Sequence, residues 1–255
     1  MKAPTTTPIQ VIDRLVSLLD ALGQQSEPLS LKVLSAETGL HPSTAHRILA
    51  SLAAHHLVER SEAGAYQLGP HLLTLASRAQ RQLDPRREAL PVMEWLRGEI
   101  GETVNLTVRE GDVLVYIERV LSQKAMRVEQ VIGSRAPLHV TAAGKLFLAD
   151  EGETACADYA QRHGLEAYTV NTITDLARLT AAVEEARSRG YAFDDEEAEL
   201  GVGCIGAPVR DAGGRMVAGL SVSAPIQRRR QEWLPLVLEA GQRLSARLGY
   251  LSISL

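Results

Sequence analysis

Four polar residues that lie close together, Ser43, Thr44, His46 and Arg47, carry side chains that can hydrogen-bond to DNA. An arginine can make two hydrogen bonds to the edge of guanine, while hydroxyl and imidazole groups suit phosphates and other base edges. The apolar residues around them recur at i, i+3, i+4 and i+7, which predicts a helix with one buried face. Those apolar residues are Ala45, Ile48, Leu49 and Leu52. We expect the polar face to enter a DNA major groove, with Arg47 contacting guanine.

The elements around this helix predict a winged helix-turn-helix. Leu31 and Leu34 stand at helical spacing before it, and Gly39 and Leu40 separate the two helices. Ser30 is expected to cap the first helix of the pair.

Two short strand candidates, 58–60 and 65–68, follow the helix pair and form the wing. Arg60, in the wing, is expected to contact the DNA backbone. Helix-turn-helix units also serve protein contacts, but the cluster of four polar side chains on one face favours DNA.

Downstream, Cys204, His139 and Asp194 have the types of a nucleophile, a base and an orienting acid. No nucleophile elbow surrounds Cys204, and a lone cysteine beside a strand usually serves as a small packing residue. We therefore expect no catalytic residue. The alternative is an enzyme or a thiol-based redox switch that uses Cys204.

The run from Gly201 to Gly206 matches the dinucleotide fingerprint GxGxxG, but its context does not. No hydrophobic strand precedes it, and no acidic residue lies about 20 positions further on, where the ribose contact belongs. The histidines lack the spacing of metal ligands, apart from the adjacent His55 and His56. The sequence thus predicts no cofactor and no metal.

The charge is unevenly distributed along the chain. Residues 1–88 hold nine Lys/Arg against eight Asp/Glu, a net +1, and residues 89–255 hold 18 against 23, a net −5. DNA-binding modules are usually more basic than this. DNA binding is therefore inferred from the helix pattern and from two copies acting together, which predicts a homo-oligomer.

Bulk composition narrows the class further. The 255 residues suffice for two domains, 45% of them are hydrophobic, and no apolar run is long enough to span a membrane. The first eight residues lack the apolar core of a signal peptide. The two cysteines are too few for a disulfide framework. We expect a cytoplasmic protein with no membrane partner.

The rest of the chain mixes strands and helices. A helix over 71–83 and Pro85 predict a division into a DNA-binding domain (1–69), a linker helix (70–84) and a C-terminal domain (85–255). Hairpins and crossovers together predict an α+β class for that domain. Its expected strands are 103–109, 113–120, 125–131, 191–193, 205–209 and 216–222, with a loop over 133–141. Its expected helices run to Gly101, over 142–149, from Thr172 or Thr174 to Gly190, and over 231–248.

Three segments resemble the IclR (isocitrate lyase regulator) family of bacterial transcription factors. They are Thr38–Leu49 at the turn and recognition helix, Pro137–Lys145, and Tyr191–Pro208 followed by Ser221-Val222-Ser223. The resemblance implies a GAF-like mixed α/β effector-binding domain, a homodimer or dimer of dimers, and a small organic effector that alters binding to a DNA operator. By position, it implies these effector-binding residues: Ala142, Ala143, Asp194, Cys204, Ser221 and Ser223. We expect a repressor of a catabolic or metabolic operon, not an enzyme.

The sequence departs from the family pattern at two places. His41-Pro42 stands where Pro followed by a basic residue is common, so one DNA contact is missing or replaced. Ala142 stands where some members have Gly, which narrows the mouth of the pocket.

The chemistry of the implied pocket favours a small polar acid. Ser221 and Ser223 are two residues apart on one strand and point to the same face. The helix that starts before Gly144 can present N–H groups to an anion. Asp194 would then accept a hydrogen bond from a hydroxyl at the other end of the ligand. An aromatic carboxylate is the alternative, although few aromatic side chains could stack on it.

Overall fold

The computed structural model describes residues 9–250, which form two compact units divided between Gln82 and Leu83. The predicted linker helix corresponds to α4 (His71–Gln82), which belongs to the first unit. No helix in the described part of the chain is long and apolar enough to cross a membrane.

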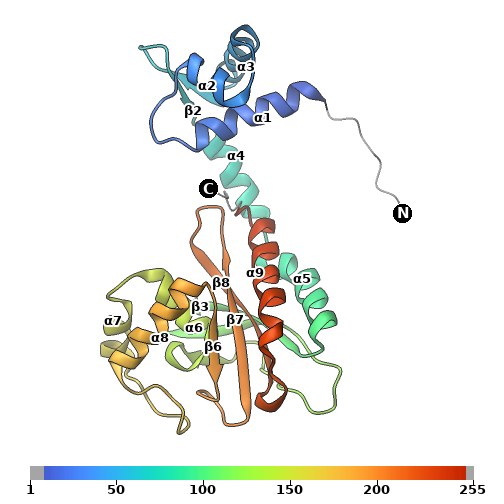
Figure 1. The fold of residues 1–255 in the computed structure, drawn as a ribbon, viewed down its shortest axis with the longest axis vertical. Helices are drawn as coiled ribbons and strands as arrows, with labels where there is room; N and C mark the ends of the chain where they lie inside the picture. The colour runs from blue at the N-terminus through green and yellow to red at the C-terminus, as the bar shows by residue number, and fades with distance from the viewer. Residues whose placement is uncertain (1–8, 251–255) are drawn as a thin grey trace. The chain divides into compact units, whose positions relative to one another are not determined.

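The first unit has the element order of a winged helix-turn-helix (Figure 1). Its further elements are α1 (Gln10–Gly23), α2 (Leu31–Thr38), α3 (Pro42–Ala54), β1 (Val58–Arg60) and β2 (Tyr66–Leu68). The two strands pair antiparallel as the wing. The apolar stripe predicted for α3 is buried, because it packs with Leu18 of α1 and Leu34 of α2 in one core.

Local signals set the boundaries of α2 and α3. The Ser30 hydroxyl accepts a hydrogen bond from the Val33 N–H at 3.4 Å, as predicted for the cap of α2. Gly39 ends α2 in the left-handed region, at φ 66°, where a side chain would be strained. The N-cap of α3 is His41, whose Nδ1 accepts from the Ser43 N–H.

The apolar faces of α1 and α4 differ from a simple core pattern. Ile12 and Val16 are 53% and 46% exposed, and the buried residues of α1 are Leu18, Ala21 and Leu22. In α4, the apolar residues Leu75 and Ala76 are exposed and Leu72 is half-buried. These stripes therefore do not find their partners within the first unit.

The second unit is a six-stranded antiparallel sheet in the order β5-β4-β3-β8-β7-β6. The strands are β3 (Thr103–Glu110), β4 (Val113–Val120), β5 (Arg135–Pro137), β6 (Ala192–Asp195), β7 (Val202–Arg210) and β8 (Met216–Pro225). The helices are α5 (Pro85–Ile100), α6 (Ala142–Glu151), α7 (Ala155–His163), α8 (Leu176–Arg189) and α9 (Leu234–Arg247).

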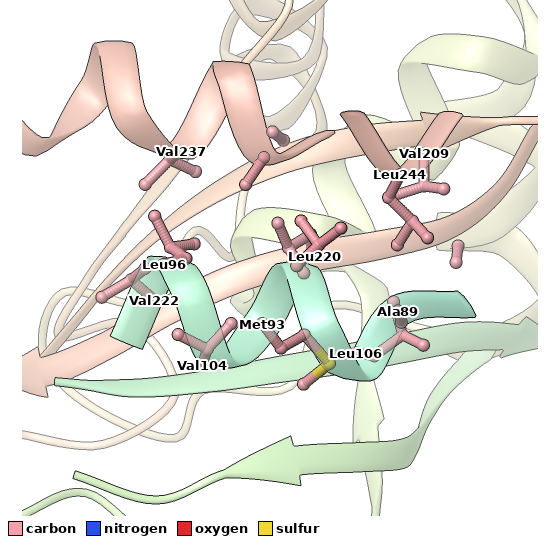
Figure 2. Packing of buried hydrophobic residues seen from close by; sticks show 14 of the residues in the cluster. Ala89, Met93, Leu96, Val104, Leu106, Val209, Leu220, Val222, Val237 and Leu244 are labelled. Atoms are coloured by element: carbon pink, nitrogen blue, oxygen red, sulfur yellow. The ribbon is translucent and has the colours of Figure 1, made fainter. Parts of the chain in front are cut away.

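Because side chains alternate along the strands, this unit has two cores, one on each face of the sheet. Leu220 and Val222 of β8 pack with Met93 of α5 and Val237 of α9 in the main core (Figure 2). The residues between them face the opposite side of the sheet, on which α6 packs. That side carries the polar residues of the candidate site.

Several predicted elements of the second unit were wrong. Residues 125–131 form no strand, because the carbonyls of Met126 and Val128 accept hydrogen bonds from the Arg228 and Thr103 side chains. The predicted loop 133–141 contains β5 and the 3-10 helix η1 (Leu138–Val140). Helix α7 was not predicted. The last helix begins as a 3-10 turn, Gln231–Trp233, before α9.

The cap of α8 also differs from the prediction. Its N-cap is Asp175, whose Oδ1 accepts from the Arg178 N–H at 2.9 Å. The Thr172 hydroxyl is buried and already donates to the Glu197 carbonyl at 2.7 Å. Thr172 therefore holds the preceding loop and does not cap the helix.

Candidate functional site

The polar face of α3 is open, as the sequence predicts. Ser43, His46 and Arg47 are exposed and Thr44 is half-buried, on the side opposite the buried stripe. Arg60 is exposed in the wing, where its guanidinium lies 5.6 Å from the Tyr66 ring centroid. Its Nε approaches the Gly64 carbonyl at 3.5 Å, so the side chain rests on its own hairpin.

His41, where the sequence departs from the family pattern, has a structural task at the start of α3. Its Nδ1 lies 2.8 Å from the Ser43 hydroxyl and also caps the helix. A small polar imidazole therefore orders the first residue of the candidate DNA-contacting face.

A cavity of about 240 Å³ lies in the second unit between the sheet and the start of α6. Five of the six residues implied as effector-binding line it: Ala142, Ala143, Asp194, Cys204 and Ser221. Ser223 does not line it. Its hydroxyl accepts from Asn105 Nδ2 at 3.0 Å and lies 3.2 Å from Cys204 Sγ, so it supports Cys204 from behind.

Other lining residues were missed by the sequence reasoning. Thr107 and Tyr116 come from β3 and β4, and Gln130, Tyr168 and Glu199 from loops. The register of β3 and β4 shifts between Leu106 and Thr107, where Thr107 pairs with Tyr116. Simple alternation along the sequence cannot place such a bulge. The available signal was that Thr107 and Tyr116 carry polar groups on the two strands of one predicted hairpin.

Two glycines allow α6 to approach the sheet closely. A Cβ on Gly219 of β8 would lie 2.5 Å from the Ala143 Cβ, and one on Gly206 of β7 would lie 3.1 Å from the Ala142 Cβ. Real atoms do not approach as closely as the first of these distances. Because Gly206 and Gly219 carry no side chain, the N-terminus of α6 can reach the cavity wall.

The N-terminus of α6 offers unused hydrogen-bond donors. Thr141 caps the helix by accepting from the Gly144 N–H at 3.2 Å. The N–H groups of Ala142 and Ala143 donate to no acceptor among residues 9–250. Both residues line the cavity, and a helix N-terminus favours negative charge. This end of the cavity suits an anion.

Asp194 is the principal ionisable group in the wall. Its residue is 2% exposed, and Oδ1 accepts from the Glu197 N–H at 2.8 Å. Burial raises the pKa of Asp194 to about 6, the backbone hydrogen bond opposes that shift, and the Glu197 carboxylate adds to it. Asp194 is therefore more easily protonated than an ordinary aspartate.

Cys204 is held as a thiol. Part of its surface faces the cavity, but the protein encloses the sulfur, and this burial raises the pKa of the Cys204 thiol well above its usual range. The charge of Asp194 acts in the same direction. Thiolate is the nucleophilic form, so this environment disfavours both covalent catalysis and rapid oxidation.

Cys204, His139 and Asp194, the residues that the sequence analysis weighed for catalysis, include no free base. Both ring nitrogens of His139 are engaged: Nδ1 with the Tyr159 hydroxyl at 2.8 Å, and Nε2 with the Glu166 carbonyl at 3.0 Å. The imidazole is fully buried. The glycine run 201–206 enters β7 and precedes no helix, which excludes the dinucleotide-binding geometry.

Comparison with known proteins agrees with both units. The family model described as the IclR helix-turn-helix domain matches residues 11–62, and the one described as "Bacterial transcriptional regulator IclR C-terminal" matches residues 78–246. The transcriptional repressor IclR of Escherichia coli strain K12 is 31% identical over 254 residues, which cover 97% of this chain and 93% of that protein.

Solved structures give the same assignment. The Agobacterium tumefaciens repressor BlcR has a TM-score of 0.79 at 29% identity, covering 97% of this chain and 100% of that chain. An IclR homolog from Microbacterium hydrocarbonoxydans, complexed with 4-hydroxybenzoate, has a TM-score of 0.61 at 25% identity, with 93% and 98% covered. The chain therefore belongs to the IclR family of DNA-binding transcriptional regulators.

Proposed function

We propose that the protein is a repressor of a catabolic or metabolic operon, that it acts in the cytoplasm, and that a small organic acid in the cavity of the second unit controls it. The observation that carries this proposal is the lining of the cavity, where the unpaired N–H groups of Ala142 and Ala143 and the buried carboxyl of Asp194 occur together. The polar face of α3 supplies the DNA contacts.

On the DNA side, Arg47 contacts a guanine, and Ser43, Thr44 and His46 contact phosphates or base edges. Arg60 approaches the backbone from the wing. Replacing Arg47 by Ala should weaken specific binding by about 1–3 kcal/mol and relax the preference at one base pair in each half-site.

A gel-shift titration against the operator and a scrambled duplex measures this effect. Arg215→Ala is the matched control, because Arg215 is an exposed arginine of the second unit and its loss changes the net charge equally. If Arg47→Ala binds as tightly and selectively as the parent, the proposed orientation of α3 on DNA is wrong.

Two copies are needed for useful affinity. The first 88 residues carry a net charge of only +1, so one chain offers few phosphate contacts. The exposed side chains of Ile12 and Val16 on α1, with Ile9 at its N-cap, supply an apolar face for a second copy. A dimer places two recognition helices in successive major grooves, about 34 Å apart.

In the cavity, the carboxylate of the effector lies at the Ala142 and Ala143 N–H groups, and a hydroxyl or carbonyl at its other end meets Asp194. Ser221 contributes a hydroxyl from β8. The relative from Microbacterium hydrocarbonoxydans is complexed with 4-hydroxybenzoate, an acid that carries both groups. This likeness supports an acid as the ligand class.

Calorimetry on the full chain with a panel of small hydroxy and oxo acids tests the effector site. We expect submillimolar binding of at least one acid, reduced by Ser221→Ala and unchanged by Ser188→Ala, an exposed serine of α8. Tight binding of large apolar compounds alone would contradict the proposal.

The alternative regulator is a thiol-based redox switch at Cys204. Blocking the thiol would then abolish the response of DNA binding while small acids had no effect. The raised pKa of the Cys204 thiol favours the acid-responsive repressor over this switch.

A further inference from the structure

We propose that the proton on Asp194 selects between two classes of effector, so that a 2-oxo acid binds with the carboxyl protonated and a 2-hydroxy acid binds with either form. This inference rests on the proposed effector site and adds the chemistry that governs it. The selection follows from the surroundings of the carboxyl and from hydrogen-bond donor and acceptor rules.

No cation of the described chain pairs with the Asp194 carboxyl. The charge of Lys145 in α6 lowers the pKa of Asp194, but the Lys145 Nζ donates to Glu197 Oε1 at 2.5 Å and to the Phe193 carbonyl at 2.8 Å. Arg229 binds the Asp195 carboxylate and approaches only the backbone oxygen of Asp194, at 3.4 Å. The buried carboxyl thus lacks the partner that would keep it ionised.

The other titratable groups around the carboxyl come from the sheet and from the loop after β6. Tyr116 of β4 and Cys204 of β7 stay neutral, because burial raises the pKa of each. Glu197 follows Asp194 on the same loop, and its negative charge disfavours ionisation of Asp194. Cys204 of β7 is paired with Asp194 of β6 in the strand register, and its Sγ lies 3.2 Å from the Ser223 hydroxyl.

Three further ionisable side chains line the cavity. Glu199 adds a carboxylate, and burial raises the pKa of Tyr168, which leaves it neutral. Arg135 reaches outward to Glu110 Oε2 at 2.8 Å. None of the three is paired with Asp194.

An incoming carboxylate at the α6 N-terminus brings more negative charge into the same small cavity. It therefore favours the protonated form of Asp194. The keto oxygen of a 2-oxo acid only accepts hydrogen bonds, so it needs the O–H of the protonated carboxyl. The hydroxyl of a 2-hydroxy acid both donates and accepts, so it can meet either form.

The size of the effect follows from the fraction of Asp194 that is protonated. With a pKa of about 6, this fraction rises roughly 25-fold between pH 7.5 and pH 5.5. The apparent affinity for a 2-oxo acid rises by the same factor, because only the protonated fraction binds it. A 2-hydroxy acid gains much less. Both acids remain ionised over this range, so their own titration does not contribute.

The test is calorimetry on the full chain with 2-oxobutyrate and 2-hydroxybutyrate at pH 5.5, 6.5 and 7.5. Two buffers with different heats of protonation report how many protons are taken up. At pH 7.5 we expect nearly one proton for 2-oxobutyrate and clearly fewer for 2-hydroxybutyrate. Titrations elsewhere that respond to binding are common to both ligands and cancel in the comparison.

Asp194→Asn and the control Asp158→Asn complete the experiment. Asparagine at position 194 keeps a donor and an acceptor without titrating, so 2-oxobutyrate should bind it with the same affinity at each pH. Asp158 is an exposed aspartate in the first turn of α7, and Asp158→Asn should keep the wild-type pH dependence. Urea unfolding of both variants confirms that they fold.

The outcomes separate this inference from the proposed function. Equal pH dependence for the two acids, or the same dependence in Asp194→Asn, overturns the role of Asp194 and leaves effector binding intact. If neither acid binds to the wild type at any pH, the proposed effector chemistry fails and the inference fails with it.

Discussion

At the scale of single residues, the cavity depends on glycines that let helix α6 pack close to the sheet. Gly219 leaves room for Ala143, and the N-terminus of α6 reaches the wall because of it. A methyl group there would overlap the Ala143 Cβ and crowd Thr107 Oγ1 at 3.0 Å. Helix and strand would have to separate, which moves the N–H groups away from the ligand.

Gly219→Ala should therefore lower the free energy of unfolding of the second unit by about 1–3 kcal/mol, as overpacking does. Urea unfolding followed by tryptophan fluorescence measures it, because both tryptophans, Trp95 and Trp233, lie in this unit. Gly98→Ala is the control: Gly98 is exposed in α5 with nothing within 4 Å of a Cβ, and alanine should stabilise it by about 0.5–1 kcal/mol. Equal effects of the two substitutions would contradict this account.

The buried His139 is expected to make the free energy of unfolding depend on pH. Burial holds the pKa of His139 below its usual range, while its hydrogen bond to the Glu166 carbonyl opposes this shift. The unfolded chain takes up a proton near pH 6.5 and the folded chain does not. The neutral histidine thus favours folding above pH 6.5, and this advantage is lost as the pH falls below that value.

We expect the stability gap between the wild type and His139→Gln to shrink from pH 7 to pH 5, by at most about 1.4 kcal/mol per pH unit. Urea unfolding at three pH values measures the gap, and the other titrating groups cancel in the difference. Parallel pH curves for the two proteins would show that His139 does not titrate differently in the folded state.

The residues of the cavity show which part of the site a sequence can reveal. Ala142, Ala143, Asp194, Cys204 and Ser221 lie in short segments with distinctive residue order, and all five line the cavity. Thr107 and Tyr116 were missed because a bulge sets the register of their hairpin. Ser223 shares a face with Ser221, but its hydroxyl is hydrogen-bonded to Asn105 and Cys204.

At the scale of elements, periodicity located helices more reliably than it located their caps or partners. The stripe of α3 is buried as predicted, and α5 ends before Gly101 as predicted. The segment 125–131 alternates like a strand, yet two of its carbonyls accept hydrogen bonds from side chains distant in sequence. Such bonds depend on the tertiary fold and leave no local signal.

The cap of α8 gives a direct test at this scale. Asp175→Ala removes the acceptor for the Arg178 N–H and should cost about 1 kcal/mol of stability. Thr174→Ala, at the exposed neighbouring position that the sequence also favoured as a cap, should leave stability within about 0.5 kcal/mol of the wild type. A larger loss for Thr174→Ala would restore the original prediction.

At the scale of the whole molecule, the order of the elements identified both units, because a helix-turn-helix and an α+β sensor domain have different residue periods. The sequence could not show where the apolar residues of α1 would go. Ile12 and Val16 resemble a core stripe, but the first unit buries Leu18, Ala21 and Leu22 in their place. This exposed stripe is the basis for the proposed contact with a second copy of the chain.

This stripe leads to a prediction for the assembled protein. Val16→Asp puts a charge at a position that is 46% exposed, so folding should change little while self-association weakens. Because two half-sites must be held together for tight binding, affinity for the full operator should fall at least tenfold, about 1.4 kcal/mol. Sedimentation velocity and gel shift on the same samples measure the two effects.

The control is Val170→Asp, which places the same charge on a valine that is 91% exposed in a loop of the second unit. It should leave both the sedimentation coefficient and the DNA affinity unchanged, because a single exposed apolar residue needs no partner. If Val16→Asp keeps the oligomeric state and the operator affinity of the wild type, the α1 stripe is not the interface. If it loses affinity while the oligomer persists, α1 acts on DNA by a route other than pairing two chains.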